Sequence, residues 1–417
     1  MGRLLLVRGI RQLVTMRGSL APRRGAQLRD IAIIPDAAML IADGRIQQLG
    51  PAARIENLAE TRKAEEFPIP GHVVIPGFVD SHTHLVFGPP RPDDFEQRIA
   101  GASYLDIARA GGGILSSVRA VRNAPASRLR YQARLHLRRA ASFGSTTLEA
   151  KSGYGLDESA ELKTLRIYRA LDGELLNVVP TYLGPHATPP EFAGRPDDFI
   201  EFLTARPLPV IAKRRLARFA DAYCDRGAFT LEQSRRFLSA ARKLRLRIPL
   251  HASQFEDCGA VGLAIELGAR SADHLEAIGP SSIDSLARSS VIATLLPASV
   301  HCLGPGRFAP ARALIDAGAA VALATDFNPG TSPTLSMPFV LSLACTHMRM
   351  TPAEALAAAT INGAFALGLQ AETGSLEAGK WADFAVLQCT DYRELPYYAG
   401  MNLIGMTVRR GEIIHPK

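Results

Sequence analysis

Residues 76–87 of the chain read PGFVDSHTHLVF, an apolar segment that runs into a pair of histidines. The apolar residues predict a buried strand, and His82 and His84 follow where that strand would end. Because these positions are two residues apart, both imidazoles project to the same side of an extended backbone and can bind one metal ion. A strand histidine can equally be packed or solvated, so the pair gains meaning only from partners elsewhere in the chain.

Three more polar residues end other short apolar runs. His251 follows the run IPL, Asp326 follows the run VALAT, and His274 ends a third predicted strand. An aspartate in such a place can simply cap a helix or form a turn. However, parallel strands of a barrel deliver the side chains at their C-terminal ends to one face, so these residues are expected to meet the histidine pair. Three histidines and one aspartate make a plausible metal shell.

The middle of the chain alternates short apolar runs with helical stretches such as 230–244 and 352–367. This is the pattern of parallel strands joined by crossover helices. Eight strands with intervening helices predict a (β/α)8 barrel, whose active site lies at the C-terminal ends of the strands. The predicted strands are residues 78–85, 146–150, 177–183, 219–224, 247–252, 272–275, 291–296 and 320–326.

Both ends of the chain read as short strands. An Asp43-Gly44 turn stands between two apolar runs, and residues 407–414 have the pattern of a second hairpin. The predicted fold is therefore α/β, a TIM-like barrel with a small β-sandwich domain formed by the N- and C-terminal segments. The predicted division assigns residues 1–75 and 371–417 to the small domain and residues 76–370 to the barrel.

Composition narrows the class of protein. The 417 residues contain no apolar run near the roughly 18 residues of a membrane span, and the first residues lack the pattern of a secretory signal, which predicts a cytoplasmic protein. Five cysteines without CxxC pairing argue against a disulfide scaffold and a cysteine zinc cluster. The net charge of +8 is spread along the chain without a nucleic-acid recognition motif, so it suits attraction of a small anionic substrate instead.

Four blocks in the order observed here resemble the amidohydrolase superfamily and, within it, the imidazolonepropionase family. They are residues 76–87, residues 110–116 (AGGGILS), residues 151–155 (KSGYG) and residues 326–330 (DFNPG). The resemblance covers nearly the whole chain and implies a homodimer.

The resemblance also implies that a single zinc or iron ion is held by His82, His84, His251 and Asp326. Hydantoinase-like relatives bridge two metals with a lysine after strand four, but residues 219–224 contain none, which favours one metal. A divalent cation lowers the pKa of bound water from 15.7 toward about 7 and polarises a carbonyl, and amide hydrolysis needs both effects.

In the imidazolonepropionase family the ring amide of 4-imidazolone-5-propanoate is hydrolysed to N-formimidoyl-L-glutamate. The resemblance implies proton transfer by Asp326, and a role for His274 beside the attacking water or the developing oxyanion. A guanidinium fork suits the substrate carboxylate. The residues implied in substrate binding are Arg91, Tyr154, His186, Gln254, Asn328, Gly330 and Thr331.

The chain departs from the family pattern at several of these positions. Gln254 stands where some relatives carry glutamate; its amide can orient a ring by hydrogen bonds but cannot relay a proton, which disfavours a cytosine deaminase. Pro89, Pro90 and Pro185 flank presumed substrate contacts and stiffen those loops. A related enzyme acting on another small cyclic amide or amidine stays open, whereas a catalytically inactive scaffold is disfavoured by the intact ligand set.

Overall fold

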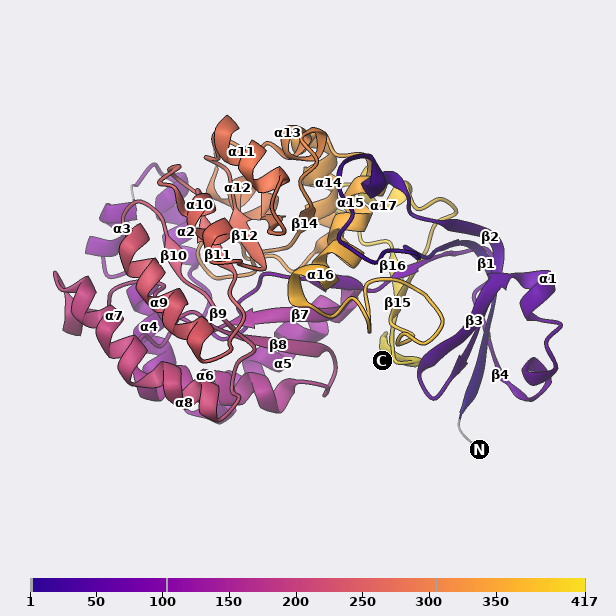
Figure 1. Ribbon diagram of the computed structural model, residues 1–417. Helices are drawn as coiled ribbons and strands as arrows, with labels where there is room; N and C mark the ends of the chain where they lie inside the picture. Colours follow the sequence, from indigo (N-terminus) through magenta and orange to yellow (C-terminus); the bar gives the residue numbers. More distant parts are fainter. Residues whose placement is uncertain (1–2, 103, 305, 417) are drawn as a thin grey trace.

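A barrel of parallel strands forms the body of the computed structural model, which describes residues 3–102, 104–304 and 306–416 (Figure 1). Hydrogen bonds join its strands in the orders β6-β7-β8-β9 and β10-β11-β12-β13-β14. These strands are β6 (Phe78–Asp80), β7 (Ser145–Lys151), β8 (Asn177–Tyr182), β9 (Phe219–Ala220), β10 (Tyr223–Cys224), β11 (Leu250–Ala252), β12 (Ser271–His274), β13 (Ile292–Leu295) and β14 (Val321–Leu323). All eight predicted strands occur in order, the fourth as the two short strands β9 and β10, so the predicted (β/α)8 barrel is confirmed.

Backbone contacts close the barrel at both gaps between these two sets of strands. Phe219 in β9 forms a parallel bridge with Arg247, which precedes β11, and Thr83 forms one with Phe327 beyond β14. Next to the second bridge, the amide of Asp326 donates to the carbonyl of His82 at 2.9 Å. The first barrel strand therefore ends beside the last one, which brings the histidine pair next to Asp326.

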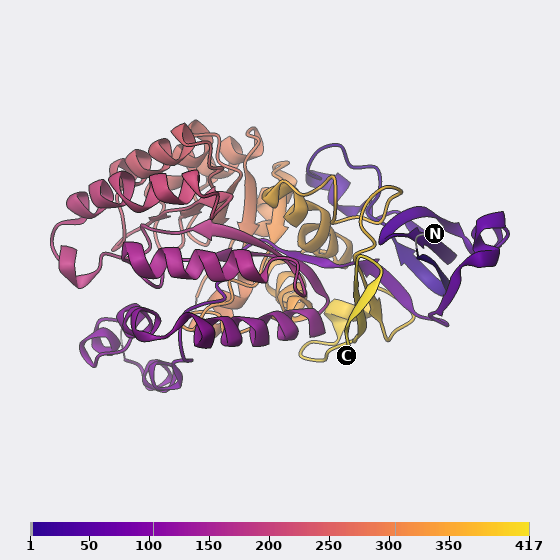
Figure 2. The same ribbon diagram turned by 90° about the horizontal axis from the view of Figure 1, so that it is seen from below.

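Helices cover the outside of the barrel, so its strands are buried on both faces (Figures 1 and 2). All three residues of β14 (Val, Ala and Leu) are buried, which explains why such a strand reads as a short apolar run instead of an alternating one. The helices between the barrel strands are α2 (Pro92–Ile99), α3 (Tyr104–Arg109), α4 (Ile114–Asn123), α5 (Ala126–Ser142), α6 (Glu158–Leu171), η3 (Pro190–Phe192), α7 (Pro196–Ala205), α8 (Pro207–Lys213), α9 (Leu231–Lys243), α10 (Ala260–Glu266), α11 (Pro280–Ala287), α12 (Pro297–Leu303) and α13 (Ala311–Asp316).

The two helical stretches predicted from the sequence are present and begin at capping boxes. Thr230 and Gln233 cap α9, and Thr351 and Glu354 cap the second stretch. That stretch follows α14 (Met337–Met348) and consists of α15 (Pro352–Ala357), the π-helical turn η4 (Ala358–Asn362) and α16 (Gly363–Leu367). Within the described ranges, no helix is both long and apolar enough to cross a lipid bilayer.

Strands from both ends of the chain form one eight-stranded sheet beside the barrel, where the termini lie (Figures 1 and 2). The order is β17-β16-β15-β5-β1-β2-β3, and β4 pairs with β1. The strands are β1 (Leu4–Val14), β2 (Ile33–Ala42), β3 (Arg45–Pro51), β4 (Glu65–Pro68), β5 (Val73–Pro76), β15 (Phe384–Leu387), β16 (Ile404–Arg409) and β17 (Glu412–His415). The short helices here are η1 (Gly25–Arg29), α1 (Ala52–Ile55), η2 (Ala59–Lys63) and α17 (Glu394–Tyr397).

The predicted small β domain is thus made by both termini, with all eight strands in one hydrogen-bonded sheet. Its long strand β1 changes register between Val7 and Ile10, where Gly9 has a φ of +77°. A left-handed glycine of this kind bends a strand, so one half of β1 pairs with β4 while the other half pairs with β5. The sheet encloses its own apolar core, and the residue at which the two domains divide stays a prediction.

A candidate metal centre at the barrel mouth

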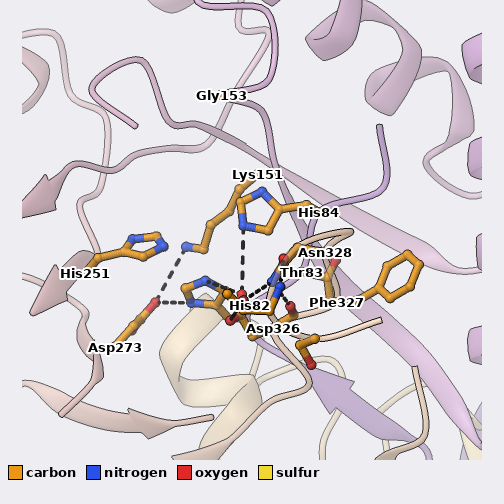
Figure 3. Close-up of polar contacts among 12 residues, drawn as sticks. His82, Thr83, His84, Lys151, Gly153, His251, Asp273, Asp326, Phe327 and Asn328 are labelled. Atoms are coloured by element: carbon orange, nitrogen blue, oxygen red, sulfur yellow. Dashed lines mark hydrogen bonds and ion pairs between the residues drawn. The ribbon is translucent and has the colours of Figure 1, made fainter. Parts of the chain in front are cut away.

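The histidines and the aspartate singled out in the sequence lie together at the C-terminal ends of the barrel strands (Figure 3). The ring of His82 lies 5.9 Å from that of His84, 4.6 Å from that of His251 and 5.6 Å from that of His274, between centroids. Asp326 places Oδ1 3.5 Å from Nε2 of His82. All five side chains are buried, so the strand ends do bring these distant positions into one site.

Two of these residues have a backbone conformation that L-amino acids rarely adopt. His274 has a φ of +85° and Asp326 a φ of +53°, both in the left-handed region. Such conformations cost roughly 1 to 3 kcal/mol each and persist where the surrounding structure imposes them, as at binding sites. Part of the constraint on Asp326 comes from the neighbouring Thr325, whose amide and hydroxyl donate to the buried carboxylate of Asp80 at 2.9 and 2.6 Å.

The ligand atoms fit a divalent metal ion. Those of His82, His84 and Asp326 lie within 4.8 Å of one another, and those of His82, His251 and His274 form an overlapping group of the same size. Nε2 of His82 is buried without a hydrogen-bond partner, as expected of an atom that serves as a metal ligand. Imidazole nitrogens with a carboxylate oxygen suit zinc or iron.

Burial keeps the histidine pair neutral, which is the form that binds a metal. It holds the pKa of His82 and of His84 well below the ordinary value. Nδ1 of His82 lies 2.7 Å from Oδ2 of Asp273, so the Nδ1 proton is directed at that carboxylate. The lone pair on Nε2 is then free to bind an ion together with His84 and Asp326, an arrangement typical of metal-binding histidines.

Behind the histidines lies a buried network of charges. The ammonium of Lys151 donates to Glu149 at 2.9 Å and to Asp221 at 2.8 Å, and lies 3.5 Å from Asp273. Burial opposes the charge of Lys151, yet the three carboxylates raise the pKa of its ammonium above the usual range. Burial raises the pKa of Glu149 to about 8 and also raises the pKa of Asp273, which Lys151 opposes. Burial likewise opposes the charge on Asp221, but His251 and Lys151 hold the pKa of that carboxyl below its usual range.

His274, in β12, differs in its protonation from His82 and His84. Burial opposes its charge, but Glu276, whose Oε1 lies 3.6 Å from Nδ1 of His274, raises the pKa of the imidazole to about 9. Burial also raises the pKa of Asp326. The mouth of the barrel therefore holds a proton donor and a potential proton acceptor side by side at neutral pH.

Two aromatic residues form a wall beside the metal group. The rings of Tyr154 and His186 lie 5.2 Å apart, and the ring of His84 lies 5.2 Å from Tyr154 and 5.6 Å from His186. Burial lowers the pKa of His186 to about 4, so the ring is neutral. Nδ1 of His186 lies 2.9 Å from the carbonyl oxygen of Gly153, to which it donates, and Nε2 remains an acceptor.

The loop after Asp326 forms a compact polar turn beside Arg91. The Asn328 side-chain oxygen accepts from the amides of Gly330 and Thr331, at 2.8 Å each. A Cβ added to Gly330 would lie 2.1 Å from a terminal nitrogen of Arg91, so glycine is required for the guanidinium to approach the turn. Nε of Arg91 lies 3.5 Å from Asp94, which orients the side chain.

Gln254 lies on the loop that leaves β11 below this wall. The carboxylate of Asp225 accepts from the backbone amides of Gln254 at 2.6 Å, Phe255 at 3.0 Å and Glu256 at 3.2 Å. Three donors on one carboxylate fix the course of the loop. The structure thus brings every residue proposed from the sequence to one end of the barrel.

Four charged residues of the site were not assigned from the sequence: Glu149, Lys151, Asp221 and Asp273. A signal for two of them exists, since Glu149 and Lys151 are charged residues two positions apart at the end of a predicted strand and therefore point to the same side. The sequence interpretation sought a lysine only after strand four. The lysine of this site comes instead from β7, the second barrel strand, and its ammonium is held by carboxylates.

Comparison with known proteins agrees with this architecture. A model of the amidohydrolase family matches residues 224–414. Escherichia coli guanine deaminase aligns with a TM-score of 0.72 at 15% identity, covering 99% of each chain. A zinc-bound adenosine deaminase from Xanthomonas campestris aligns with a TM-score of 0.68 at 18% identity, covering 98% of this chain and 92% of that one. These structures share the fold.

Closer relatives are found among curated sequences. The imidazolonepropionase of Chloroflexus aggregans is 43% identical over 420 residues, which cover 98% of both chains. The imidazolonepropionase of Solibacter usitatus is 46% identical over 407 residues, which cover 97% of both. With this identity over nearly its full length, the chain belongs to the imidazolonepropionase family.

Proposed function

We propose that the protein hydrolyses the ring amide of 4-imidazolone-5-propanoate to N-formimidoyl-L-glutamate, a step of histidine degradation. The observation that carries this proposal is the site at the barrel mouth, where a metal-binding group, a proton donor and a proton acceptor adjoin a wall that suits a polar ring. Membership of the imidazolonepropionase family supports the choice of substrate.

His82, His84, His251 and Asp326 are proposed to hold one metal ion, zinc or iron. When bound, the ion would polarise the amide carbonyl and lower the pKa of water. Amide hydrolysis at neutral pH requires both effects. Asp273 orients His82 for this purpose through the 2.7 Å contact with Nδ1.

Proton movement is assigned to two side chains. Asp326 accepts the proton of the attacking water on its carboxylate and returns it to the ring nitrogen that leaves, because its backbone conformation fixes it at the centre of the site. Against the effect of burial, Glu276 raises the pKa of His274 to about 9, and we assign to this imidazole the hydrogen bond to the oxygen on which negative charge develops.

Recognition of the substrate is divided between its carboxylate and its ring. Arg91, beside the turn formed by Asn328, Gly330 and Thr331, offers a guanidinium to the propionate group. Tyr154, His186 and Gln254 lie around the ring position and supply hydrogen bonds to it.

The deciding experiment is a steady-state assay on freshly generated 4-imidazolone-5-propanoate with identification of N-formimidoyl-L-glutamate as product. Hydantoin, dihydropyrimidine and cytosine serve as competing substrates, and chelator-treated protein serves as the metal-free control. Turnover of the imidazolone, abolished by the chelator and restored by zinc or iron, is expected. A metal-loaded sample that leaves the imidazolone intact but opens another ring would assign the protein to the alternative cyclic amides.

The alternative of another cyclic-amide substrate rests on the prolines in the loops beside the presumed substrate contacts. Pro89 and Pro90 are exposed, whereas Pro185 is buried and its carbonyl accepts from the amide of Tyr223 at 2.9 Å. Pro185 thereby fixes the loop that carries His186, so the ring pocket has a rigid shape. A homodimer and a cytoplasmic location remain predictions, which size measurement in solution and cell fractionation would test.

A further inference from the structure

One buried lysine connects two of the proposed metal ligands. The side chain of Lys151 is completely buried, and Figure 3 shows it reaching from β7 between His251 and Asp273. Its ammonium lies 2.8 Å from Asp221 and 3.5 Å from Asp273. A third carboxylate, that of Glu149, accepts at 2.9 Å. The ammonium thus donates two hydrogen bonds, to Asp221 and Glu149, and forms an ion pair with Asp273, and these three contacts hold it in place.

The two aspartates held by Lys151 in turn contact two of the histidines. Asp221 lies 3.0 Å from Nδ1 of His251, and Asp273 lies 2.7 Å from Nδ1 of His82. The contact of His82 is a hydrogen bond, whereas that of His251 is close but lacks hydrogen-bond geometry. Both histidines have Nδ1 next to a carboxylate, which leaves Nε2 for a metal ion. The ammonium of Lys151 thus contacts both of the aspartates that lie next to these histidines.

Without the ammonium, this arrangement would be hard to maintain. Asp221 and Asp273 are fully buried and carry charges of the same sign, so they repel each other and resist loss of water. Removing one partner of a buried ion pair leaves an uncompensated charge, which makes side chains rotate or take up protons. Either change would release the Nδ1 atoms of both histidines.

We propose that Lys151 is a positioning residue that holds Asp221 and Asp273 in place, so that these carboxylates orient His251 and His82 for the metal ion. The inference rests on the metal binding proposed above but not on the identity of the substrate. It distinguishes Lys151 from a mere positive charge near the site, because a charge alone would repel a divalent cation.

The test is the zinc dissociation constant of the full chain after removal of metal, measured by competition with a chromophoric chelator. Lys151→Met keeps the length of the side chain but removes its charge and donors. Positioning predicts zinc binding about 10- to 100-fold weaker than in the wild type. If Lys151 acts only by its charge, the same substitution should tighten zinc binding, and unchanged or tighter binding overturns the proposal.

Lys163→Met is the matched control. Lys163 is partly buried and donates to three acceptors, the carbonyl oxygens of Val121, Arg122 and Ala124, but it contacts no residue of the metal centre. This variant loses a comparable set of contacts and should keep the wild-type zinc affinity. A loss of affinity as large as that of Lys151→Met would show that a general loss of packing explains both, which overturns the proposal.

A second readout needs no variant. In the metal-free wild type, nitrogen-15 spectra of labelled histidines should show His82 and His251 with the proton on Nδ1. Protons on Nε2 would contradict the proposed orientation.

If Lys151→Met does not fold, Asp273→Asn is compared with Lys151→Met/Asp273→Asn. The buried charges of this double variant are more nearly balanced than those of Lys151→Met alone. The double variant should bind zinc more weakly than the single one, through the lost support of Asp221, and equal or tighter binding overturns the proposal.

These readouts separate the inference from the proposed reaction. If the wild type binds zinc but does not hydrolyse the imidazolone, the proposed substrate is wrong while the zinc affinities still test Lys151. If the imidazolone is hydrolysed and Lys151→Met binds zinc as tightly as the wild type, the role of Lys151 is wrong while the reaction stands.

Discussion

The hydroxyl of Tyr223 donates a hydrogen bond to Oε1 of Gln254 over 2.8 Å. This contact occupies the oxygen of the amide and so fixes its rotation, which leaves the NH2 group for the substrate. Tyr223 begins β10, the second part of the fourth barrel strand, and its ring lies 5.5 Å from that of His251. The pair therefore places a hydrogen-bond donor, not a base, beside the proposed metal ligands.

Replacement of Gln254 separates hydrogen bonding from proton transfer. Gln254→Leu should lower kcat/KM by about 5- to 150-fold, since a buried hydrogen-bonding partner is worth about 1 to 3 kcal/mol. Gln254→Glu keeps the hydrogen bond from Tyr223 but loses the NH2 donor, so its kcat/KM should lie between that of the leucine variant and that of the wild type. Both variants are measured at matched metal occupancy and with folding checked by circular dichroism. Wild-type kinetics in the leucine variant would place Gln254 outside the functional site.

Replacement of His82 or of His84 should reduce both the metal content and the activity. His82→Ala or His84→Ala deletes one of the few ligands of an open catalytic site, so most bound metal should be lost. Metal content by elemental analysis and turnover are measured on the same preparations. Stoichiometric metal with normal turnover in both variants would refute the ligand assignment.

Arg91→Met should weaken binding of the anionic substrate and spare the metal. The substitution removes the guanidinium beside Gly330 without touching the metal group, so KM should rise by about tenfold or more while metal content stays constant. An uncharged substrate analogue provides the control, because its KM should change little. An unchanged kcat/KM for the acid would make Arg91 only a loop residue.

A buried carboxyl group in the small domain predicts a pH-dependent stability. Burial raises the pKa of Asp383 to about 6, although its Oδ1 accepts from the amide of Arg410 at 2.8 Å. Because the folded pKa lies above the unfolded one, the stability that this group contributes is complete below about pH 4 and is lost as the pH rises through about 6. Asp383→Asn stays neutral and can keep the acceptor.

The Tm of Asp383→Asn minus that of the wild type should therefore increase between pH 4.5 and pH 7.5. The shift of about two pKa units corresponds to roughly 3 kcal/mol at most in favour of the variant. Differential scanning calorimetry at both pH values measures it, and the subtraction removes the titration of all other groups. An equal difference at the two pH values would mean that Asp383 titrates normally.

The sequence by itself determined the barrel and most of the proposed site. Short apolar runs between helical stretches gave the strand count, since strands buried on both faces carry mostly apolar side chains. The spacing of His82 and His84 fixed their common side, because strand side chains alternate with a period of two. His251 and Asp326 were found because parallel strands end at one face.

Only the tertiary structure decided which charged residues stand behind the ligands. Lys151 and Asp221 are 70 residues apart, and His82 and Asp273 are 191 apart. No local pattern encodes such pairs, because the closure of the barrel sets which strand ends face each other. The same holds for the small domain, where Gly9 bends β1 and all eight strands join one sheet. Strand identity follows from local periodicity, whereas contacts across the barrel depend on the packing of the whole chain.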